Sequence, residues 1–460
     1  MILCYASAMK QLIESQKTFF NNCTTLDTGF RIQKLKQLKK LLKENEDELY
    51  HAVYADFKKS SYETYISELG QIYREINKAC KQVRKWSRKK KVKTDIMNFP
   101  AGSYLVPVPL GVVLIIGSWN FPYMLSLIPA VSALAAGNTV VLKPSELPEQ
   151  SSHVLARLIN ENFEPDYFRV VEGGVPETTE LLDQKFDKIF FTGSTKVGKI
   201  VYQAAAKNLI PVTLEMGGKN PVIFTEHCEL KKSVKRLIWA KFLNAGQTCI
   251  APDYILVHQS VKDEFLRLAV AEIQKSHFSF GNQNYVQTIS KEHAERLIRL
   301  IEKDKIFYGG SYDAESRYVE PTILHNIGFE DAIMQEEIFG PVLPVIGYTD
   351  LNEVISKIRS LPSPLSFYVF TKNKQIKHKL LREVPFGGGA VNDSVMHFIN
   401  MNLPFGGVGN SGTGSYHGEY GFKTFTHYKG ILDKPTWFEP PIKYFPHTKF
   451  KLKLIKRLIE

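Results

Sequence analysis

The chain has 460 residues, of which 44% are hydrophobic and 23% charged. This composition is ordinary for a globular protein and excludes a largely disordered chain, and the length predicts two or three domains. The formal net charge of +12 favours anionic partners such as nucleotide cofactors, acidic membrane surfaces or nucleic acid, without choosing among them.

The five cysteines are scattered along the chain, and no two of them form a CxxC pair. Their odd number and spacing argue against a disulfide framework and against a structural zinc site, so no metal is expected. A reducing, cytoplasmic compartment fits this pattern. The N-terminus lacks a basic stretch before its apolar residues, and its apolar run is short for a signal peptide.

Helical spacing of apolar residues predicts helices over residues 30–58 and 61–86. Residues 105–142 contain no charged side chain and are long enough to cross a membrane. Proline and glycine residues divide this stretch into short pieces, however. We therefore predict a buried strand, a loop, a helix and a second strand instead of a membrane span.

Strands and helices alternate along the middle of the chain. The predicted strands are residues 112–116, 139–142, 167–171, 188–191 and 212–215, and the helices between them are 123–136, 150–162, 177–182 and 195–207. This alternation predicts a parallel, doubly wound sheet that binds ligands at the carboxyl ends of its strands. The alternation resumes after Pro221, which predicts a second α/β domain. The glycine-rich residues 387–414 read as loops near a site.

Three residues are candidates for chemistry. Cys249 follows a glycine-containing turn and offers a thiolate nucleophile, although an isolated cysteine is more often a small buried apolar residue. Glu215 ends a predicted strand, where a carboxylate suits a general base; the alternative is a solvated glutamate before a turn. Asn120 offers an amide donor to an oxyanion; its alternative role is a helix cap.

Two segments are candidates for nucleotide binding. Lys143, Ser145 and Glu146 lie at the end of the second predicted strand, where a doubly wound sheet presents groups to a ribose. Residues 193–198 join a strand to a helix, and the free N–H groups of a helix start attract a pyrophosphate. The segment nearly matches a P-loop, but Ile200 occupies the place of the Mg²⁺-binding hydroxyl, which disfavours nucleoside triphosphate hydrolysis. The GxGxxG fingerprint is absent here.

Seven motifs occur in order along the chain: WNFP, LKPSE, FTGSTKVG, LEMGGKNP, NAGQTC, EEIFGP and LPFGGVGNSG. Together they resemble the aldehyde dehydrogenase superfamily from about Lys40 to about Lys429. The strings GQTCIAPDY and SYHGEYGFKTFTH are most similar to its class 3 branch, which includes fatty aldehyde dehydrogenases.

The resemblance implies a role for each matching residue. Cys249 would attack the aldehyde, the Asn120 amide and the Cys249 N–H would hold the oxyanion, and Glu215 would activate the hydrolytic water. Lys143 and Glu146 would contact the adenosine ribose, residues 193–198 the pyrophosphate, Glu337 the nicotinamide ribose, and Phe339 the nicotinamide. The full cofactor-binding set is Trp119, Lys143, Ser145, Glu146, Gly193, Ser194, Thr195, Lys196, Val197, Gly198, Glu337 and Phe339.

The implied α/β fold has two doubly wound parallel-sheet domains and a small β oligomerisation part. The implied division is an NAD(P)-binding domain over residues 1–80 and 105–215, a catalytic domain over 216–395, an oligomerisation part over 81–104 and 396–430, and a basic tail over 431–460. Class 3 relatives are usually dimers, so a homodimer is expected.

The expected function is NAD(P)-dependent oxidation of an apolar aldehyde, medium- to long-chain aliphatic or aromatic, to the carboxylic acid. Glu146 should repel a 2′-phosphate, which favours NAD, and NADP stays possible. The alternatives are an acylating variant that passes the thioester to another acceptor, and a catalytically silent cofactor-binding protein of the same fold. No nucleic-acid module is found.

The C-terminal tail alternates Lys or Arg with Phe, Leu and Ile between Lys449 and Ile459. Such a basic amphipathic segment can make weak peripheral contact with an anionic membrane. We prefer packing of the tail on its own dimer, because the apolar residues are few for firm insertion.

Overall fold

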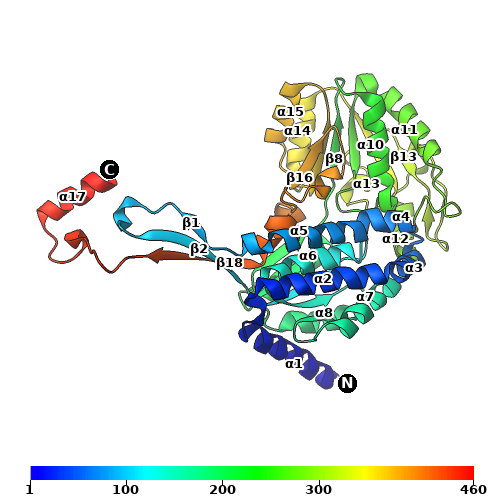
Figure 1. The fold of residues 1–460 in the computed structure, drawn as a ribbon. Helices are drawn as coiled ribbons and strands as arrows, with labels where there is room; N and C mark the ends of the chain where they lie inside the picture. Colours follow the sequence, from blue (N-terminus) through cyan, green and yellow to red (C-terminus); the bar gives the residue numbers. More distant parts are fainter. Residues whose placement is uncertain (1) are drawn as a thin grey trace.

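The computed structural model describes residues 2–460, without the side chains of the first seven residues, so that of Cys4 lies outside the described part. Two α/β lobes are joined by strands and loops, and a thin β arm projects from the body (Figure 1). The predicted fold class, with two mainly parallel sheets, is confirmed.

The first lobe contains a six-stranded sheet in the order β17-β7-β6-β3-β4-β5, parallel except for β17. The predicted strands are confirmed within a residue or so. Their bounds are β3 Val112–Ile116, β4 Thr139–Lys143, β5 Phe168–Val170, β6 Lys188–Thr192, β7 Val212–Glu215 and β17 Gly412–Thr413.

Alternate residues of β3 enter two different cores, as the period of a strand requires. Val113 and Ile115 pack with α2, α3, α5, α6 and α7, whereas Val112 and Leu114 pack with α1, α8 and α9 on the opposite face. The helices are α1 Ile2–Asn21, α2 Thr28–Glu44, α3 Glu46–Phe57, α4 Ser61–Thr64, a π-turn Tyr65–Leu69, α5 Gly70–Trp86, α6 Met124–Ala136, α7 Glu149–Asn162, α8 Val175–Asp183 and α9 Thr195–Ala206.

Helix α6 is buried along its whole length and ends at Gly137, as predicted. Gly137 has φ +98, and a Cβ there would lie 2.6 Å from the Arg31 guanidinium. A glycine is therefore needed both for the left-handed turn and for the close approach. Asn138 then accepts from the N–H groups of Leu110 and Gly111, which fixes the start of β3. The charge-free stretch is thus a core element.

The second lobe contains a seven-stranded sheet in the order β10-β13-β14-β9-β8-β15-β16, parallel except for β10. Its strands are β8 Pro221–Phe224, β9 Tyr254–His258, β10 Ile306–Tyr308, β13 Thr322–Leu324, β14 Val342–Tyr348, β15 Ser366–Phe370 and β16 Gly388–Val391. Its helices are α10 Leu230–Phe242, α11 Lys262–Ser276, α12 Lys291–Arg299, α13 Ala332–Gln335, α14 Leu351–Ser360 and α15 Lys374–Glu383. A hairpin of β11 Tyr312–Asp313 and β12 Tyr318–Val319 lies at its edge.

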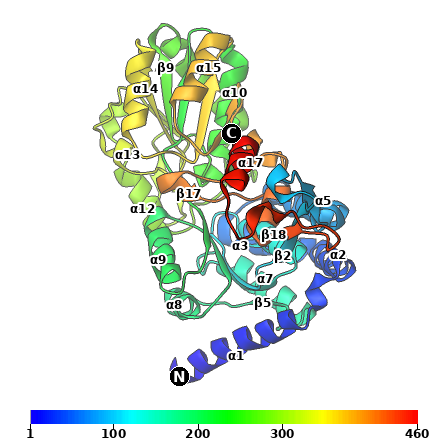
Figure 2. The same ribbon diagram turned by 90° about the vertical axis from the view of Figure 1, so that its left-hand side faces the viewer.

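The arm is an antiparallel sheet of β1 Lys90–Val92, β2 Gly102–Pro109 and β18 Thr426–Asp433, which follows α16 Gly418–Thr424. The chain then ends in helix α17, Lys449–Ile459, at the far end of the arm (Figures 1 and 2). The alternation of basic and apolar residues in this tail therefore belongs to a helix. Among the described helices, none is long and apolar enough to cross a membrane.

A buried ion pair joins the loop before α4 to the π-turn that follows it. The Nζ of Lys59 donates to Glu68 Oε1 at 2.9 Å, and both side chains are fully buried. The other oxygen of Glu68 accepts from the N–H of Tyr123, at the start of α6. We expect Lys59→Met to lower the free energy of unfolding by about 3–5 kcal/mol, because it strands a buried carboxylate.

Urea denaturation checks this expectation, with Lys40→Met as the control. In the part of the chain that the structure describes, Lys40 pairs only with exposed Glu44, so its loss should change stability by less than about 0.5 kcal/mol. Equal stability of the two variants would contradict a structural role for the buried pair.

Candidate active site

A cavity of about 520 Å³ lies at the carboxyl ends of β3, β4, β6 and β7. This is the edge at which a doubly wound sheet binds its ligand. Of the residues predicted from the sequence, those lining the cavity are Trp119, Asn120, Lys143, Ser145, Glu146, Gly193, Ser194, Val197, Glu215, Cys249, Glu337 and Phe339. Thr195, Lys196 and Gly198 are not in the lining.

A left-handed turn places Cys249. Asn244, Ala245 and Gly246 have φ values of 54°, 50° and 74° in succession. A Cβ on Gly246 would lie 2.3 Å from the carbonyl oxygen of Gly340, so only glycine fits there. The half-buried side chain of Glu63 accepts from the Asn244 N–H at 2.7 Å and supports the turn. Strain of this kind is held only where the surroundings enforce it.

Asn120 is bound to the same turn. Its Nδ2 donates to the backbone carbonyl of Gln247 at 3.0 Å, and its backbone carbonyl accepts from Asn244 Nδ2 at 2.9 Å. The side chain is 2% exposed. Because an amide nitrogen carries two N–H groups, one donor is bound to the turn and the second remains available to a ligand in the cavity that Asn120 lines.

Glu215 ends β7 and is 3% exposed. Among the described residues, neither of its carboxylate oxygens has a hydrogen-bond partner. Burial raises the pKa of this carboxyl well above its usual range. The strand edge is closed by β17, where Gly412 lies opposite Glu215. A buried carboxyl without partners in a cavity is poised to exchange a proton with a ligand or water.

Cys249 lines this cavity and also a second cavity of about 590 Å³, whose lining side chains are mainly apolar. Cys249 is therefore half-buried at the boundary of the two cavities and is not sealed in the interior. Burial, followed by the nearby carboxyls of Glu337 and Glu215, raises the pKa of the thiol to about 12. The free protein thus carries a protonated thiol at neutral pH, and nucleophilic attack requires the proton to be removed or a positive charge nearby.

The raised pKa of Cys249 predicts a pH dependence of its alkylation. Only the thiolate reacts with iodoacetamide, so below the pKa the rate should rise about tenfold per pH unit. We expect this rise from pH 7 to pH 10 in the ligand-free protein, followed by peptide mass spectrometry. A rate that is constant above pH 8 would contradict the raised pKa.

The cavity suits a dinucleotide at the end of β4. Lys143 is buried, its Nζ donates to the Pro144 carbonyl at 2.7 Å, and Glu146 Oε2 lies 3.9 Å from it. Burial lowers the pKa of the Lys143 ammonium. An amine and a carboxylate together can bind the hydroxyls of a ribose.

Ser194 caps α9, whose first N–H groups have no partner within the helix, as an anion site requires.

Gly198 serves the same strand–helix junction without touching the cavity. A Cβ there would lie 2.4 Å from the sulfur of Met216, so glycine allows α9 to pack closely on the end of β7. Thr195 turns aside and donates to the carbonyl of Asn410 at 3.0 Å.

Glu337 and Phe339 close the other end of the cavity. A Cβ on Gly217 would lie 2.3 Å from the Glu337 carboxylate, so the glycine leaves the space that this side chain fills. Burial, followed by the nearby carboxylate of Asp253, raises the pKa of Glu337 to about 8. The ring of Phe339 meets Trp119 edge-on at 5.2 Å, which gives the cavity an aromatic wall.

The sequence did not point to several residues that support the site. His293 lines the cavity, and its Nε2 lies 2.9 Å from the Phe339 carbonyl. Lys219 Nζ donates to Asp253 at 2.5 Å and to the Glu336 carbonyl at 2.8 Å, and so holds the segment before Glu337. Lys219 stands within the motif LEMGGKNP, which could have signalled it; His293 has no such signal.

The fold and the site are those of an α/β enzyme with a thiol, an amide and a carboxyl group in one nucleotide-sized cavity. A model described as "Aldehyde dehydrogenase family" matches residues 3–431. The chain is 45% identical to 4,4'-diaponeurosporen-aldehyde dehydrogenase of Staphylococcus aureus, covering 97% of this chain and 98% of the relative. It is 40% identical to the dimeric NADP-preferring aldehyde dehydrogenase of Canis lupus familiaris, covering 95% and 97%.

A third relative, aldehyde dehydrogenase family 3 member A2 of Pongo abelii, is 41% identical, covering 92% of this chain and 88% of the relative. A solved structure titled "Substrate bound state of Staphylococcus Aureus AldH" superposes with a TM-score of 0.95 at 44% identity, covering 98% of this chain and 99% of the other. The chain belongs to the aldehyde dehydrogenase family, and the predicted similarity to its class 3 branch is confirmed.

Proposed function

We propose that this aldehyde dehydrogenase oxidises apolar aldehydes, medium- to long-chain or aromatic, to carboxylic acids through a thioester on Cys249. The observation that carries the proposal is the position of Cys249 between two cavities. One cavity presents groups suited to a dinucleotide, and the other is lined mainly by apolar side chains. The names of two relatives, which refer to a diaponeurosporen-aldehyde and to NADP, agree with this division.

The chain's own residues would act in sequence. Cys249 first loses its proton to solvent, and its thiolate adds to the carbonyl carbon. The carbonyl oxygen becomes an oxyanion held by the free N–H of Asn120 and the backbone N–H of Cys249. The oxyanion then collapses, a hydride leaves the carbon, and a thioester forms. Glu215 takes a proton from a water molecule, which attacks the thioester and releases the carboxylic acid and the thiol.

Bound NAD⁺ or NADP⁺ would supply the acceptor for the hydride. Lys143, Ser145, Glu146 and the start of α9 would hold its adenosine side, and Glu337, Phe339 and Trp119 its nicotinamide side. We expect NAD⁺ to be preferred, because Glu146 opposes a 2′-phosphate. NADP⁺ is expected to be accepted as well, because the exposed Glu146 side chain is free to turn away and Lys143 lies beside it.

An absorbance assay for NADH and NADPH over a panel of aldehydes tests this function. We expect turnover of straight-chain and aromatic aldehydes, with the carboxylic acid as product. Release of the acyl group only when a thiol acceptor such as coenzyme A is added would instead support the acylating alternative. The unpartnered Glu215 carboxyl favours hydrolysis, because it supplies a base for water.

The proposed homodimer would form through the arm. The arm projects from the body and exposes apolar side chains around its tip, among them Ile96, Phe99 and Leu432. Exposed apolar area on a projecting sheet is typical of a surface covered by a partner. Light scattering should give the mass of two chains, and Phe99→Glu should shift it towards one.

Helix α17 lies near the far end of the arm, and most of its side chains are exposed. We propose that it packs on the second subunit and contacts anionic membranes only weakly. Cosedimentation with anionic liposomes tests this: the full chain and a truncation lacking residues 443–460 should partition alike at 150 mM salt. Loss of most of the bound protein on truncation would show instead that the tail is a membrane contact.

A further inference from the structure

The apolar cavity beside Cys249 runs along one face of α5. Gly70, Gln71, Tyr73, Arg74 and Asn77 all line it, with the spacing of a single helical face. Gly70 to Asn77 alone covers about 10 Å at 1.5 Å per residue. This cavity, the apolar channel, therefore extends along this length of α5, which suits an extended chain.

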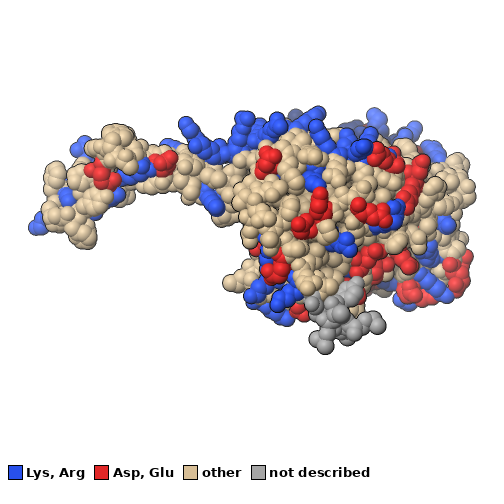
Figure 3. All heavy atoms as spheres, turned by 60° about the horizontal axis from the view of Figure 1, so that its bottom comes forward, with Lys and Arg blue, Asp and Glu red and all other residues tan. Residues whose placement is uncertain are grey.

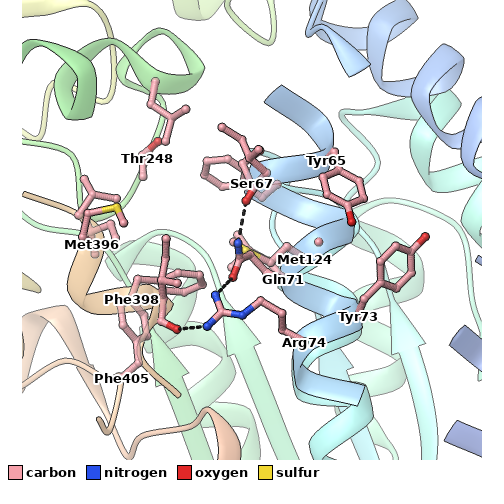
Figure 4. Close-up of a pocket in the computed structure, with 18 of the residues that line it drawn as sticks. Tyr65, Ser67, Gln71, Tyr73, Arg74, Met124, Thr248, Met396, Phe398 and Phe405 are labelled. Atoms are coloured by element: carbon pink, nitrogen blue, oxygen red, sulfur yellow. Dashed lines mark hydrogen bonds between the residues drawn. The ribbon is translucent and has the colours of Figure 1, made fainter. Parts of the chain in front are cut away.

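The inner part of this channel is apolar. Around Cys249 the lining side chains are buried and mostly hydrophobic: Phe121, Met124, Leu125, Ile250, Val395 and Phe405. Figure 4 shows Met124, Met396 and the rings of Phe398 and Phe405 facing this space. An unbranched hydrocarbon chain fits such a wall, and its burial supplies the binding energy.

The outer part of the channel is cationic. Lys39 and Lys43, four residues apart on α2, line it together with Arg74. Among the described residues that line the channel, none is acidic. Figure 3 shows Lys and Arg side chains concentrated along one edge of the molecule.

These cations have spare hydrogen-bonding capacity. The guanidinium of Arg74 uses two N–H groups, one to Gln71 Oε1 at 3.0 Å and one to the Ile399 carbonyl at 3.1 Å (Figure 4). Lys39 donates to Asn77 Oδ1 at 2.8 Å. In the described part of the chain, neither Lys39 nor Lys43 forms an ion pair. Five N–H groups on a guanidinium and three on each ammonium leave donors for an anion.

The acidic side chain of Glu46 lies near the same rim, beside Tyr73. Glu46 accepts from the hydroxyl groups of Tyr50 and Tyr73, at 3.2 and 2.7 Å. Its carboxylate is thus engaged by the tyrosines and does not line the channel. The net charge of the lining stays positive.

We propose that the preferred substrates are aldehydes whose far end carries a carboxylate, that is, ω-oxo carboxylic acids with a hydrocarbon chain between the two groups. The aldehyde meets Cys249, the chain fills the apolar part, and the carboxylate reaches Lys39, Lys43 and Arg74. This inference rests on the proposed function and adds to it the chemistry of the substrate's distal end. The product is then a dicarboxylic acid.

Three matched substrates test the proposal: 9-oxononanoic acid, its methyl ester and nonanal. With the wild-type enzyme at low ionic strength, we expect kcat/KM for the acid to exceed that for the ester by about tenfold, because three cations face the charge. The double variant Lys39→Gln/Lys43→Gln should reduce this preference to about twofold or less, mainly through KM. The control Lys40→Gln, on the same helix but paired with Glu44 outside the channel, should keep it.

Raising the salt concentration to 1 M should reduce the preference of the wild-type enzyme as well, because exposed charges are screened over about 3 Å at that ionic strength. Equal kcat/KM for acid and ester in the wild-type enzyme would overturn the proposal, as would a preference that survives the double variant. Turnover of nonanal distinguishes failure of the proposed function from failure of the substrate proposal. If none of the three aldehydes is oxidised, the proposed function is wrong. If all three are oxidised at equal rates, only the preference for a distal carboxylate is wrong.

Discussion

Replacing Cys249 by alanine is expected to abolish aldehyde oxidation, with a loss of kcat on the order of 10⁵-fold or more, because the variant has no group to form the covalent intermediate. The fold should survive, since the side chain is half-buried and the turn before it is held by Glu63, Asn120 and Gln247. Dinucleotide binding should persist, because the cradle at β4 and α9 does not include the sulfur.

Fluorescence titration with NADH and an absorbance assay together check this prediction. The control is Cys228→Ala, which removes a cysteine that lines neither the nucleotide cavity nor the apolar channel and should leave kcat unchanged. A Cys249→Ala protein that binds NADH and still oxidises aldehydes would contradict the role given to the thiol.

Replacing Glu215 by glutamine is expected to separate the two halves of the reaction. Acylation should still give one equivalent of NADH per site in a rapid burst. The following steady rate should fall by about 10²–10⁴-fold, because the amide cannot take a proton from water. Glutamine is similar in volume, so the buried site should keep its shape.

Rapid-mixing absorbance measurements resolve the burst from the steady rate. Hydroxylamine attacks a thioester without a base, so adding it should raise the steady rate of NADH formation by the Glu215→Gln protein. Rapid steady turnover of the Glu215→Gln protein without hydroxylamine would contradict the role of Glu215 as the base for water.

Much of the core could be predicted from the sequence because the signals are local. The run from Val112 to Ile116 has no charge and is rich in β-branched residues, which suits a strand covered on both faces. Gly137 stops α6 because its left-handed conformation and the nearby guanidinium of Arg31 exclude a side chain. These constraints act within a few residues and leave a visible pattern.

The arm and the tail could not be predicted in the same way. Strand β2 pairs with β18 along its length, although the two are far apart in the chain, and short exposed strands carry no apolar periodicity. In the tail, basic and apolar residues alternate only from Lys449 to Leu454, and Lys449–Ile459 is a helix capped by Thr448. Phe450, Leu454 and Leu458 are four residues apart, which is the spacing of one helical face.

The site shows the same contrast. Cys249, Glu215 and Asn120 stood in motifs, and the structure brings all three to one cavity. Phe121, Cys249 and Phe405 of the apolar channel stand in motifs, whereas the lining residues on α2, α5 and the segment 395–399 lie outside all seven motifs. Only the packing of α5 against that segment, seen in the bond from Arg74 to Ile399, brings them together.

Acid quenching followed by intact-protein and peptide mass spectrometry tests the central claim most directly. The Glu215→Gln protein is mixed with NAD⁺ and nonanal and quenched within the burst. The account predicts one nonanoyl group per chain, attached to the peptide that contains Cys249. An unmodified Cys249 during NADH formation, or an acyl group on another residue, would contradict it.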